Sequence, residues 1–341
     1  MAKRRSKLVR MGLLTLLFCL SVTGIAAENN GRTTEAVQWL ERMNQAVASM
    51  DYEGHFVYQC GKSMEAMHLR HQIGMDGPQE SLLSLTGVPR EVVRDSESIT
   101  IITNRNGKLH ITQQPAAGKL SPLKSVQPEK LQQNYGITMG GSVRIAGRPG
   151  VVIKLMPNDS LRYGYRLTLD KLSALPLDVT VVDSEENLQS RIMFTDIKIT
   201  DIDLASLQNA VDEPTTAKPV LLANMEVGMG NAEITRKPAL SPVQPDETAW
   251  NFHALPSGFD LISHQKSAQT GLEHFVFSDG LATVSVYLEP LESEKAFEGY
   301  TNLGSVRVLG RRMNNYQLTI VGEVPEKTLK LVAASIQYHE S

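Results

Sequence analysis

The hydrophobic pattern of this chain changes its period once, near Asp51, and that change limits the fold most strongly. Between 34 and 50, apolar residues recur every three or four positions, which predicts one amphipathic helix. After Asp51, apolar and polar residues alternate, starting around Phe56 and Tyr58. Further strands are predicted at 64–73, 90–94, 98–103, 108–113, 142–146, 150–156, 161–170, 175–183 and 188–199. Many strands after one helix predict a mainly β (α+β) fold with a large antiparallel sheet or partly closed barrel, rather than alternating βαβ units.

Regular alternation stops between 206 and 246, where five prolines stand among small and polar residues. This composition predicts a Pro-rich linker between a first domain at 27–205 and a second at 247–341. In the second domain, strands are predicted at 258–264, 272–278, 281–288, 304–311 and 316–323. A terminal helix is expected to begin at Pro325, with an apolar face that includes Leu329 and Val332. We therefore expect a smaller antiparallel sheet with a terminal helix.

The N-terminus predicts export. Five basic residues precede an apolar stretch from Met11 to Val22, and small residues follow it, a pattern typical of a secretory signal peptide. Residues 1–26 are assigned to this signal, with cleavage after Ala26 preferred and an uncleaved anchor as the alternative. Without the five basic residues, 29 Lys and Arg (34 less five) face 37 Asp and Glu, a net charge of −8. That balance argues against binding nucleic acid through bulk charge.

No catalytic or metal-binding pattern stands out. The sequence lacks G-x-S-x-G, H-E-x-x-H and a Walker-type loop. His68 and His71 are three positions apart on a predicted strand, so they face opposite sides and are expected to be ordinary surface histidines. We expect a protein that is not an enzyme, with no catalytic residues, cofactor or metal. Cys60 is expected to be a buried small residue, with pairing between chains as the alternative.

What remains is surface for binding. If the first sheet curves, the apolar residues on one face of its strands line the concave side, and they are the candidates for a lipid cavity. These candidates are Phe56, Tyr58, Ile99, Ile101, Leu109, Ile111, Tyr163, Tyr165, Leu177 and Val179. In the alternative, the opening helix fills the sheet and these residues form an ordinary core.

A second candidate surface is basic. Arg307, Arg311 and Arg312 lie close together in an otherwise acidic chain, with Tyr316 after a predicted turn at Asn314. Arginine and tyrosine are favoured at protein interfaces, so these four residues are candidates for binding a partner. The alternative is a solvated strand end.

Several strings, taken in order, resemble the RseB/MucB family of periplasmic regulators of the envelope-stress sigma factor (sigma-E or AlgU type). The strings are Gly87-Val-Pro-Arg-Glu-Val-Val-Arg94, Tyr163 to Asp170 with Leu175-Pro-Leu177, Leu255-Pro-x-Gly-Phe259, Phe277-Ser-Asp-Gly280 and Leu318 to Pro325. The resemblance runs from about Met43 to Ile336. One departure is the turn before Arg-Glu-Val-Val, where Thr86-Gly87-Val88-Pro89 replaces the usual acidic residue, glycine and proline.

The resemblance implies an N-terminal half-open antiparallel barrel similar to LolA and LolB, with an apolar cavity, and a smaller C-terminal domain. It also implies a periplasmic negative regulator. Such a protein binds the periplasmic region of a single-span anti-sigma factor of the RseA/MucA kind and protects it from regulated proteolysis. The resemblance implies that lipid or lipopolysaccharide promotes release. The sequence does not decide between a monomer and a homodimer. The alternative is a periplasmic lipid or lipoprotein carrier without a regulatory role.

Overall fold

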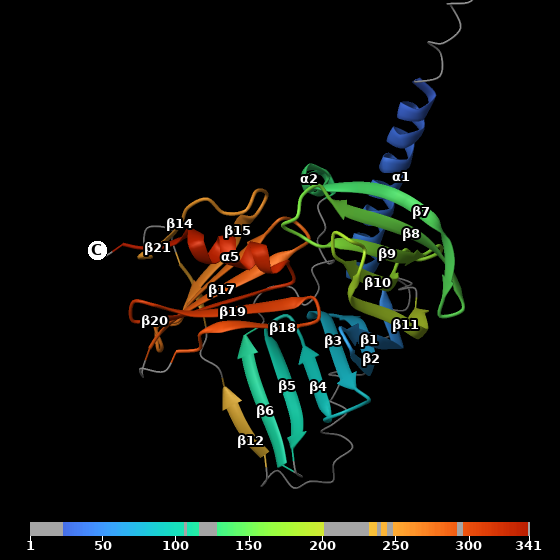
Figure 1. The fold of residues 1–341 in the computed structure, drawn as a ribbon. Helices are drawn as coiled ribbons and strands as arrows, with labels where there is room; N and C mark the ends of the chain where they lie inside the picture. The colour runs from blue at the N-terminus through green and yellow to red at the C-terminus, as the bar shows by residue number, and fades with distance from the viewer. Residues whose placement is uncertain are drawn as a thin grey trace, which may run out of the picture.

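The computed structural model describes residues 23–105, 108–115, 128–200, 232–236, 240–243, 248–291 and 296–339. It opens with α1 (Thr23–Ser49), which begins earlier than the predicted helix (Figure 1). The buried face of α1 carries Ala36, Leu40, Met43 and Val47, as the three-and-four spacing predicted. Residues 1–22 of the predicted signal peptide lie outside the described residues.

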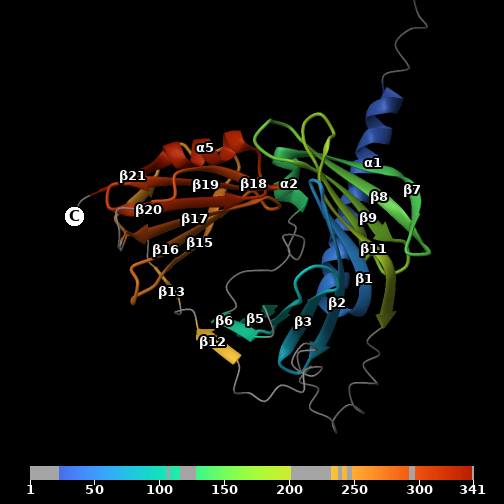
Figure 2. The ribbon, with the colours of Figure 1, turned by 60° about the horizontal axis from the view of Figure 1, so that its bottom comes forward.

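Twelve strands form the first sheet, in the order β12-β6-β5-β4-β3-β2-β1-β11-β10-β9-β8-β7. The strands are β1 (Asp51–Cys60), β2 (Ser63–Gly74), β3 (Gly77–Ser84), β4 (Arg90–Arg94), β5 (Ser98–Arg105), β6 (Lys108–Pro115), β7 (Tyr135–Ile145), β8 (Arg148–Pro157), β9 (Gly164–Asp170), β10 (Pro176–Val182), β11 (Leu188–Thr200) and β12 (Ala232–Arg236). Pairing of β1 with β11 joins two antiparallel meanders. The sheet curves strongly and does not close, because its edge strands β7 and β12 do not pair (Figure 2).

The helix α1 covers only one half of this sheet. Leu40 and Met43 share one buried cluster with Ile153 of β8 and Leu167 of β9. A short helix, α2 (Pro128–Asn134), adds Leu131 to the same cluster. A separate small cluster, centred on Phe56 of β1, Met67 of β2 and Phe194 of β11, lies where the two meanders join. The rings of Phe56 and Phe194 pack edge to face, with their centroids 5.7 Å apart.

The second domain is a seven-stranded sheet in the order β13-β15-β16-β17-β20-β19-β18. Its strands are β13 (Ser241–Pro242), β15 (Asp260–Lys266), β16 (Glu273–Ser278), β17 (Thr283–Pro290), β18 (Gly299–Leu303), β19 (Val306–Met313) and β20 (Tyr316–Gly322). The helix α5 (Glu326–Ser335) buries Leu329 and Val332 against it. A small ladder of β14 (Trp250–Phe252) and β21 (Ile336–Tyr338) completes the domain.

Three parts of the prediction need correction. The strand β12 lies inside the predicted linker at 206–246 and pairs with β6 in parallel, so the first sheet is not purely antiparallel. The strand β3 was not predicted, because Gly77 and Pro78 read as turn residues although they begin a strand. His71 was expected at the surface but is buried, since its ring stacks on Tyr52 with centroids 4.7 Å apart.

Candidate functional site

A cavity of about 480 Å³ lies within the curve of the first sheet, and side chains from β1, β2, β3, β4, β9, β10 and β11 form its walls. Val47 of α1 also lines it, so the helix borders the cavity without filling it. Most of the walls are apolar: Tyr52, Phe56, Tyr58, Met67, Leu69, Leu82, Val92, Tyr165, Leu175, Leu177, Val179, Val181, Ile192, Phe194 and Ile197. An apolar cavity of this size suits part of an acyl chain or a similar hydrocarbon group.

The structure brings together half of the residues that the sequence suggested for this cavity. Phe56, Tyr58, Tyr165, Leu177 and Val179 line its walls. The remaining candidates are not among the lining residues: Ile99, Ile101, Leu109, Ile111 and Tyr163.

Strand order explains the residues that were misplaced. Ile99 and Ile101 lie on β5, and Leu109 and Ile111 lie on β6. These strands stand beyond β4, the last strand of this half that reaches the cavity. Tyr163 is buried at the contact between the domains, where its hydroxyl accepts a hydrogen bond from Arg307 at 3.0 Å.

Some wall residues were missed although the sequence carried a signal for them. Met67 and Leu69 alternate along β2, and Ile192 and Phe194 alternate along β11. Both pairs show the same period of two that identified Phe56 and Tyr58. They could therefore have been found by extending the rule to every strand of this half.

Polar groups also border the cavity. Asp178 is held by Arg191, whose Nε lies 2.9 Å from the carboxylate, and by the hydroxyl of Thr180. Arg90 lies at the exposed side and pairs with Glu65 at 3.3 Å. The hydroxyl of Tyr165 is buried and has no hydrogen-bond partner among the described residues.

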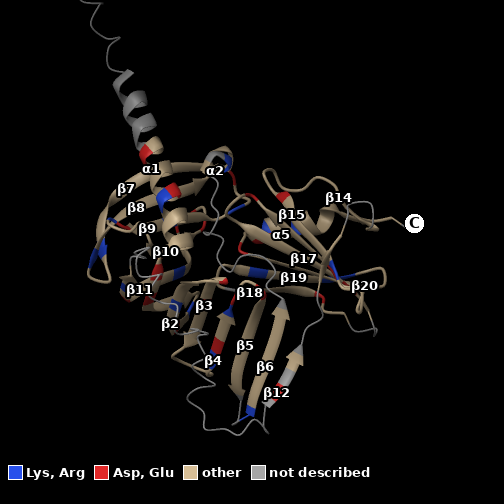
Figure 3. Cartoon of the chain, turned by 180° about the vertical axis from the view of Figure 1, so that it is seen from behind, with Lys and Arg blue, Asp and Glu red and all other residues tan. Residues whose placement is uncertain are grey.

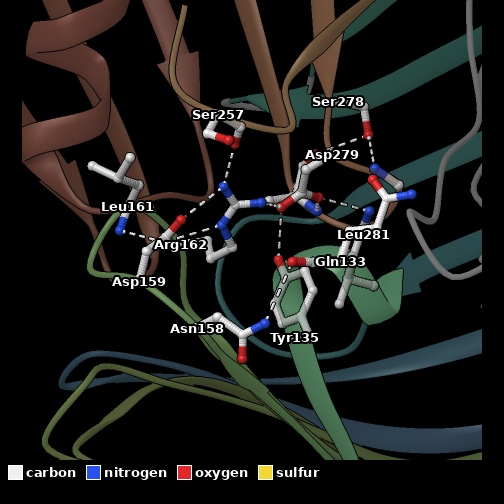
Figure 4. A network of polar contacts seen from close by, with 12 residues as sticks. Gln133, Tyr135, Asn158, Asp159, Leu161, Arg162, Ser257, Ser278, Asp279 and Leu281 are labelled. Atoms are coloured by element: carbon white, nitrogen blue, oxygen red, sulfur yellow. Dashed lines mark hydrogen bonds and ion pairs between the residues drawn. The ribbon is translucent and has the colours of Figure 1, made fainter. Parts of the chain in front are cut away.

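A buried ionic network joins the two domains (Figure 4). The guanidinium of Arg162, before β9, donates to Asp279 at 2.7 Å, and both side chains are fully buried. Arg162 also donates to Asp159 at 3.0 Å. The hydroxyl of Tyr135 donates to the same Asp279 oxygen at 2.9 Å. Although burial opposes its charge, the hydrogen bond with Asp159 and the charge of Asp279 raise the pKa of Arg162 above its ordinary value.

Three further contacts between the domains extend this interface. Gly258 has a positive φ of +82°, and a Cβ at this position would lie 2.5 Å from the Asn134 amide, so the close approach requires glycine. The hydroxyl of Thr328 donates to the carbonyl of Leu161. Lys130 of α2 forms an ion pair with Asp260 of β15. The two domains therefore meet along a specific and largely buried contact.

The four predicted partner-binding residues do not form one surface. Arg307 crosses the domain interface, where it donates to Tyr163 and to Gln189. Arg311 donates to the carbonyl of Ala333 near the end of α5, at 2.9 Å. Both guanidinium groups are thus engaged inside the protein, because positions 307 and 311 fall on the same face of β19.

The other two candidates lie near the β19–β20 turn. Arg312 is exposed and donates to the carbonyl of Asn314 at 3.1 Å. Tyr316 packs edge-on against Trp250, with ring centroids 5.0 Å apart. Viewed from behind, Lys, Arg, Asp and Glu are interspersed over both domains (Figure 3). Arg312 is therefore one basic side chain in a mixed surface.

Comparison with known proteins identifies the chain's relatives. The family model described as the MucB/RseB N-terminal domain matches residues 35–217, and the MucB/RseB C-terminal domain matches 244–337. The chain belongs to the MucB/RseB family. The matched ranges correspond to the cavity-bearing domain and to the smaller sheet with its terminal helix.

Individual members of the MucB/RseB family match nearly the whole chain. The sigma factor AlgU regulatory protein MucB of Pseudomonas aeruginosa is 30% identical over 318 residues, which cover 90% of this chain and 92% of that protein. The sigma-E factor regulatory protein RseB of Escherichia coli K12 is 25% identical over 331 residues, covering 95% and 98%. A crystal structure of MucB in complex with MucA(peri) matches with a TM-score of 0.60 and 28% identity, covering 90% of this chain and 100% of that chain.

Clusters suited to a metal ion and helices suited to a membrane span are both absent from the described residues. In this part of the chain, no three His, Cys, Asp or Glu side chains gather in a way that could hold a metal ion. Over the same residues, no helix has both the length and the apolar character that a membrane span requires.

Proposed function

We propose that this protein is a periplasmic negative regulator of an envelope-stress sigma factor. It binds the periplasmic region of a single-span anti-sigma factor and shields that region from regulated proteolysis. The single observation that carries this proposal is the match of both domains to MucB/RseB, with a solved relative bound to MucA(peri). The predicted signal peptide supports a periplasmic location.

Lipid or lipopolysaccharide promotes release in this proposal. The apolar cavity of about 480 Å³ supports binding of acyl chains, because each buried methylene contributes about 0.8 kcal/mol. Release then follows from linkage. If an amphiphile lowers the affinity for the anti-sigma factor, the anti-sigma factor lowers the affinity for the amphiphile by the same factor.

The alternative function, a lipid or lipoprotein carrier without regulatory role, rests on the same cavity. The second domain favours the regulator, because its contact with the first domain contains a buried ion pair and several side-chain hydrogen bonds.

The deciding experiment is a titration of the mature protein with the periplasmic segment of a single-span anti-sigma factor from the same organism, followed by calorimetry. We expect binding at micromolar concentration or tighter, and slower cleavage of the segment by a site-specific protease. A parallel titration with an unrelated periplasmic peptide of equal charge is the control. Lack of binding at micromolar concentration would overturn the regulator and leave the carrier.

A further inference from the structure

One wall of the cavity comes from the second domain. Glu323 follows β20 and precedes α5, yet its side chain lines the cavity of the first domain. The other lining residues lie between Val47 and Ile197. The Glu323 carboxylate accepts a hydrogen bond from Ser190 of β11 at 3.3 Å, and a second from Ser305 of the β18–β19 turn. A ligand at this wall therefore touches both domains.

The surroundings of Glu323 are unusual for a half-buried carboxylate. Two serine hydroxyls, those of Ser190 and Ser305, donate hydrogen bonds to the same oxygen of Glu323, Oε1. Among the described residues, no cation forms an ion pair with it. Burial raises the pKa of Glu323, although the hydrogen bonds from Ser305 and Ser190 oppose the change. A half-buried carboxylate without a cation leaves room for an external donor to stabilise it.

A second polar group at this end of the cavity is also unused. Tyr165 is 1% exposed, and its hydroxyl has no hydrogen-bond partner among the described residues. Tyr165 and Glu323 both line this cavity, and burial, followed by the charge of Glu323, raises the pKa of Tyr165 well above its ordinary value. The other charged wall residues have charged neighbours. Asp178 is held by Arg191, Arg90 pairs with Glu65, and Glu80 lies 3.9 Å from Arg94.

We propose that Glu323 and Tyr165 form a polar subsite of the cavity that selects amphiphiles with an ammonium head group. This rests on the proposed function only in that the cavity binds an acyl chain. An ammonium donates charge-assisted hydrogen bonds to the free oxygen of Glu323, and the Tyr165 hydroxyl accepts another. A carboxylate head group is repelled here and is drawn to Arg90 at the exposed side instead.

The test compares decylamine, decanol and decanoate below their critical micelle concentrations, by calorimetric titration of the full mature chain at pH 7. The three probes share one chain length and differ in the head group. We expect decylamine to bind at least tenfold more tightly than decanoate. In Glu323→Gln, the affinity for decylamine should fall about tenfold, while decanoate stays within twofold. Glu97→Gln, which removes an exposed carboxylate outside the cavity lining, is the matched control and should keep the preference for the amine.

A second variant guards against a folding defect. Tyr165→Phe keeps the ring in the wall and removes only the unpartnered hydroxyl, so we expect a folded protein with weaker binding of decylamine. Equal binding of amine and carboxylate to the wild type, or an equal loss of all three probes in Glu323→Gln, would overturn the subsite. Anti-sigma binding is measured without amphiphile, so its absence would overturn the regulator and leave the ranking of the three probes intact.

Discussion

The sulfur of Cys60, at the end of β1, lies against Gly304 of the β18–β19 turn, so a cysteine of one domain is covered by a glycine of the other. A Cβ built on Gly304 would stand 2.1 Å from this sulfur, and the φ of Gly304 is +59°. Only a residue without a side chain permits this approach. Cys60 is 5% exposed as a result, in agreement with the expected buried cysteine.

Cys60 should therefore report on separation of the domains. It is the single cysteine left after the predicted cleavage, so a maleimide reacts at one place. We expect slow labelling of the wild type and labelling at least tenfold faster in Gly304→Ala, because the added Cβ displaces the turn. Gly87→Ala is the matched control, since Gly87 has a φ of +73° but no atom within 4 Å. Equal labelling rates in both variants would contradict the close contact.

The buried ion pair between Arg162 and Asp279 should dominate the stability of the interface. Arg162→Met leaves Asp279 buried without its cation, and removing one partner of a buried pair costs about 3–5 kcal/mol. The control is Arg166→Met, which breaks an exposed pair with Glu186 at 3.5 Å and should cost at most about 1 kcal/mol. Chemical denaturation measures both. A loss below 1 kcal/mol in Arg162→Met would show that the network contributes little.

A charge in the cavity wall should weaken binding of acyl chains. Ile192 lines the cavity and is 37% exposed, so Ile192→Lys is expected to fold while placing an ammonium beside the ligand. The loss of apolar contact should weaken binding of decanol at least tenfold. Ile101→Lys is the control, because Ile101 lies on β5 outside the cavity. If the two variants bind decanol equally well, the ligand occupies another place.

His274 should make the second domain sensitive to acid. Burial, with a contribution from His264, lowers the pKa of His274 to about 4. As the pH falls from about 6.5 to about 4, the unfolded chain takes up a proton that the folded chain does not, so stability falls across this window and levels off below it. At about 1.4 kcal/mol per pH unit, reduced for partial exposure, the loss is about 2 kcal/mol.

His274→Phe tests this expectation by removing the titrating group while keeping a ring stacked on Tyr287, which lies 4.2 Å from the histidine ring. The variant should lose about 2 kcal/mol less than the wild type between pH 7 and pH 4, as measured by denaturation. Replacement of the exposed His253 should leave the pH profile unchanged. A wild-type profile in His274→Phe would rule His274 out as the cause.

Charge reversal at Arg312 tests the one predicted partner-binding arginine that remains exposed. Arg312→Glu should slow association with the anti-sigma segment several-fold and flatten its dependence on salt, because exposed charges act mainly on the association rate. Arg311 is left unchanged, since its bond to Ala333 supports α5. Unchanged association rates at every salt concentration would place the partner site elsewhere.

The two meanders, the smaller second sheet and five of the residues lining the cavity could be predicted because alternation along a strand identifies which side chains share a face. Alternation does not reveal the position of a strand in the sheet, and this is why Ile99 and Ile111 were placed in the cavity. Glu323 had no local signal at all. Its partner Ser190 is 133 residues away, and only the docking of the second domain brings them together.

The pairing of β12 with β6 limits how far the two domains can part. Arg236 ends β12 in the first sheet, and Ser241 begins β13, which pairs with β15 in the second. Five Cα–Cα steps separate these residues, a reach of about 18 Å at most. While both strands stay paired, the domains can rotate about this short connection but cannot move apart. For the domains to separate fully, β12 would first have to lose its pairing with β6 at the edge of the first sheet. The edge strand of the first domain therefore sets how far the second domain can move.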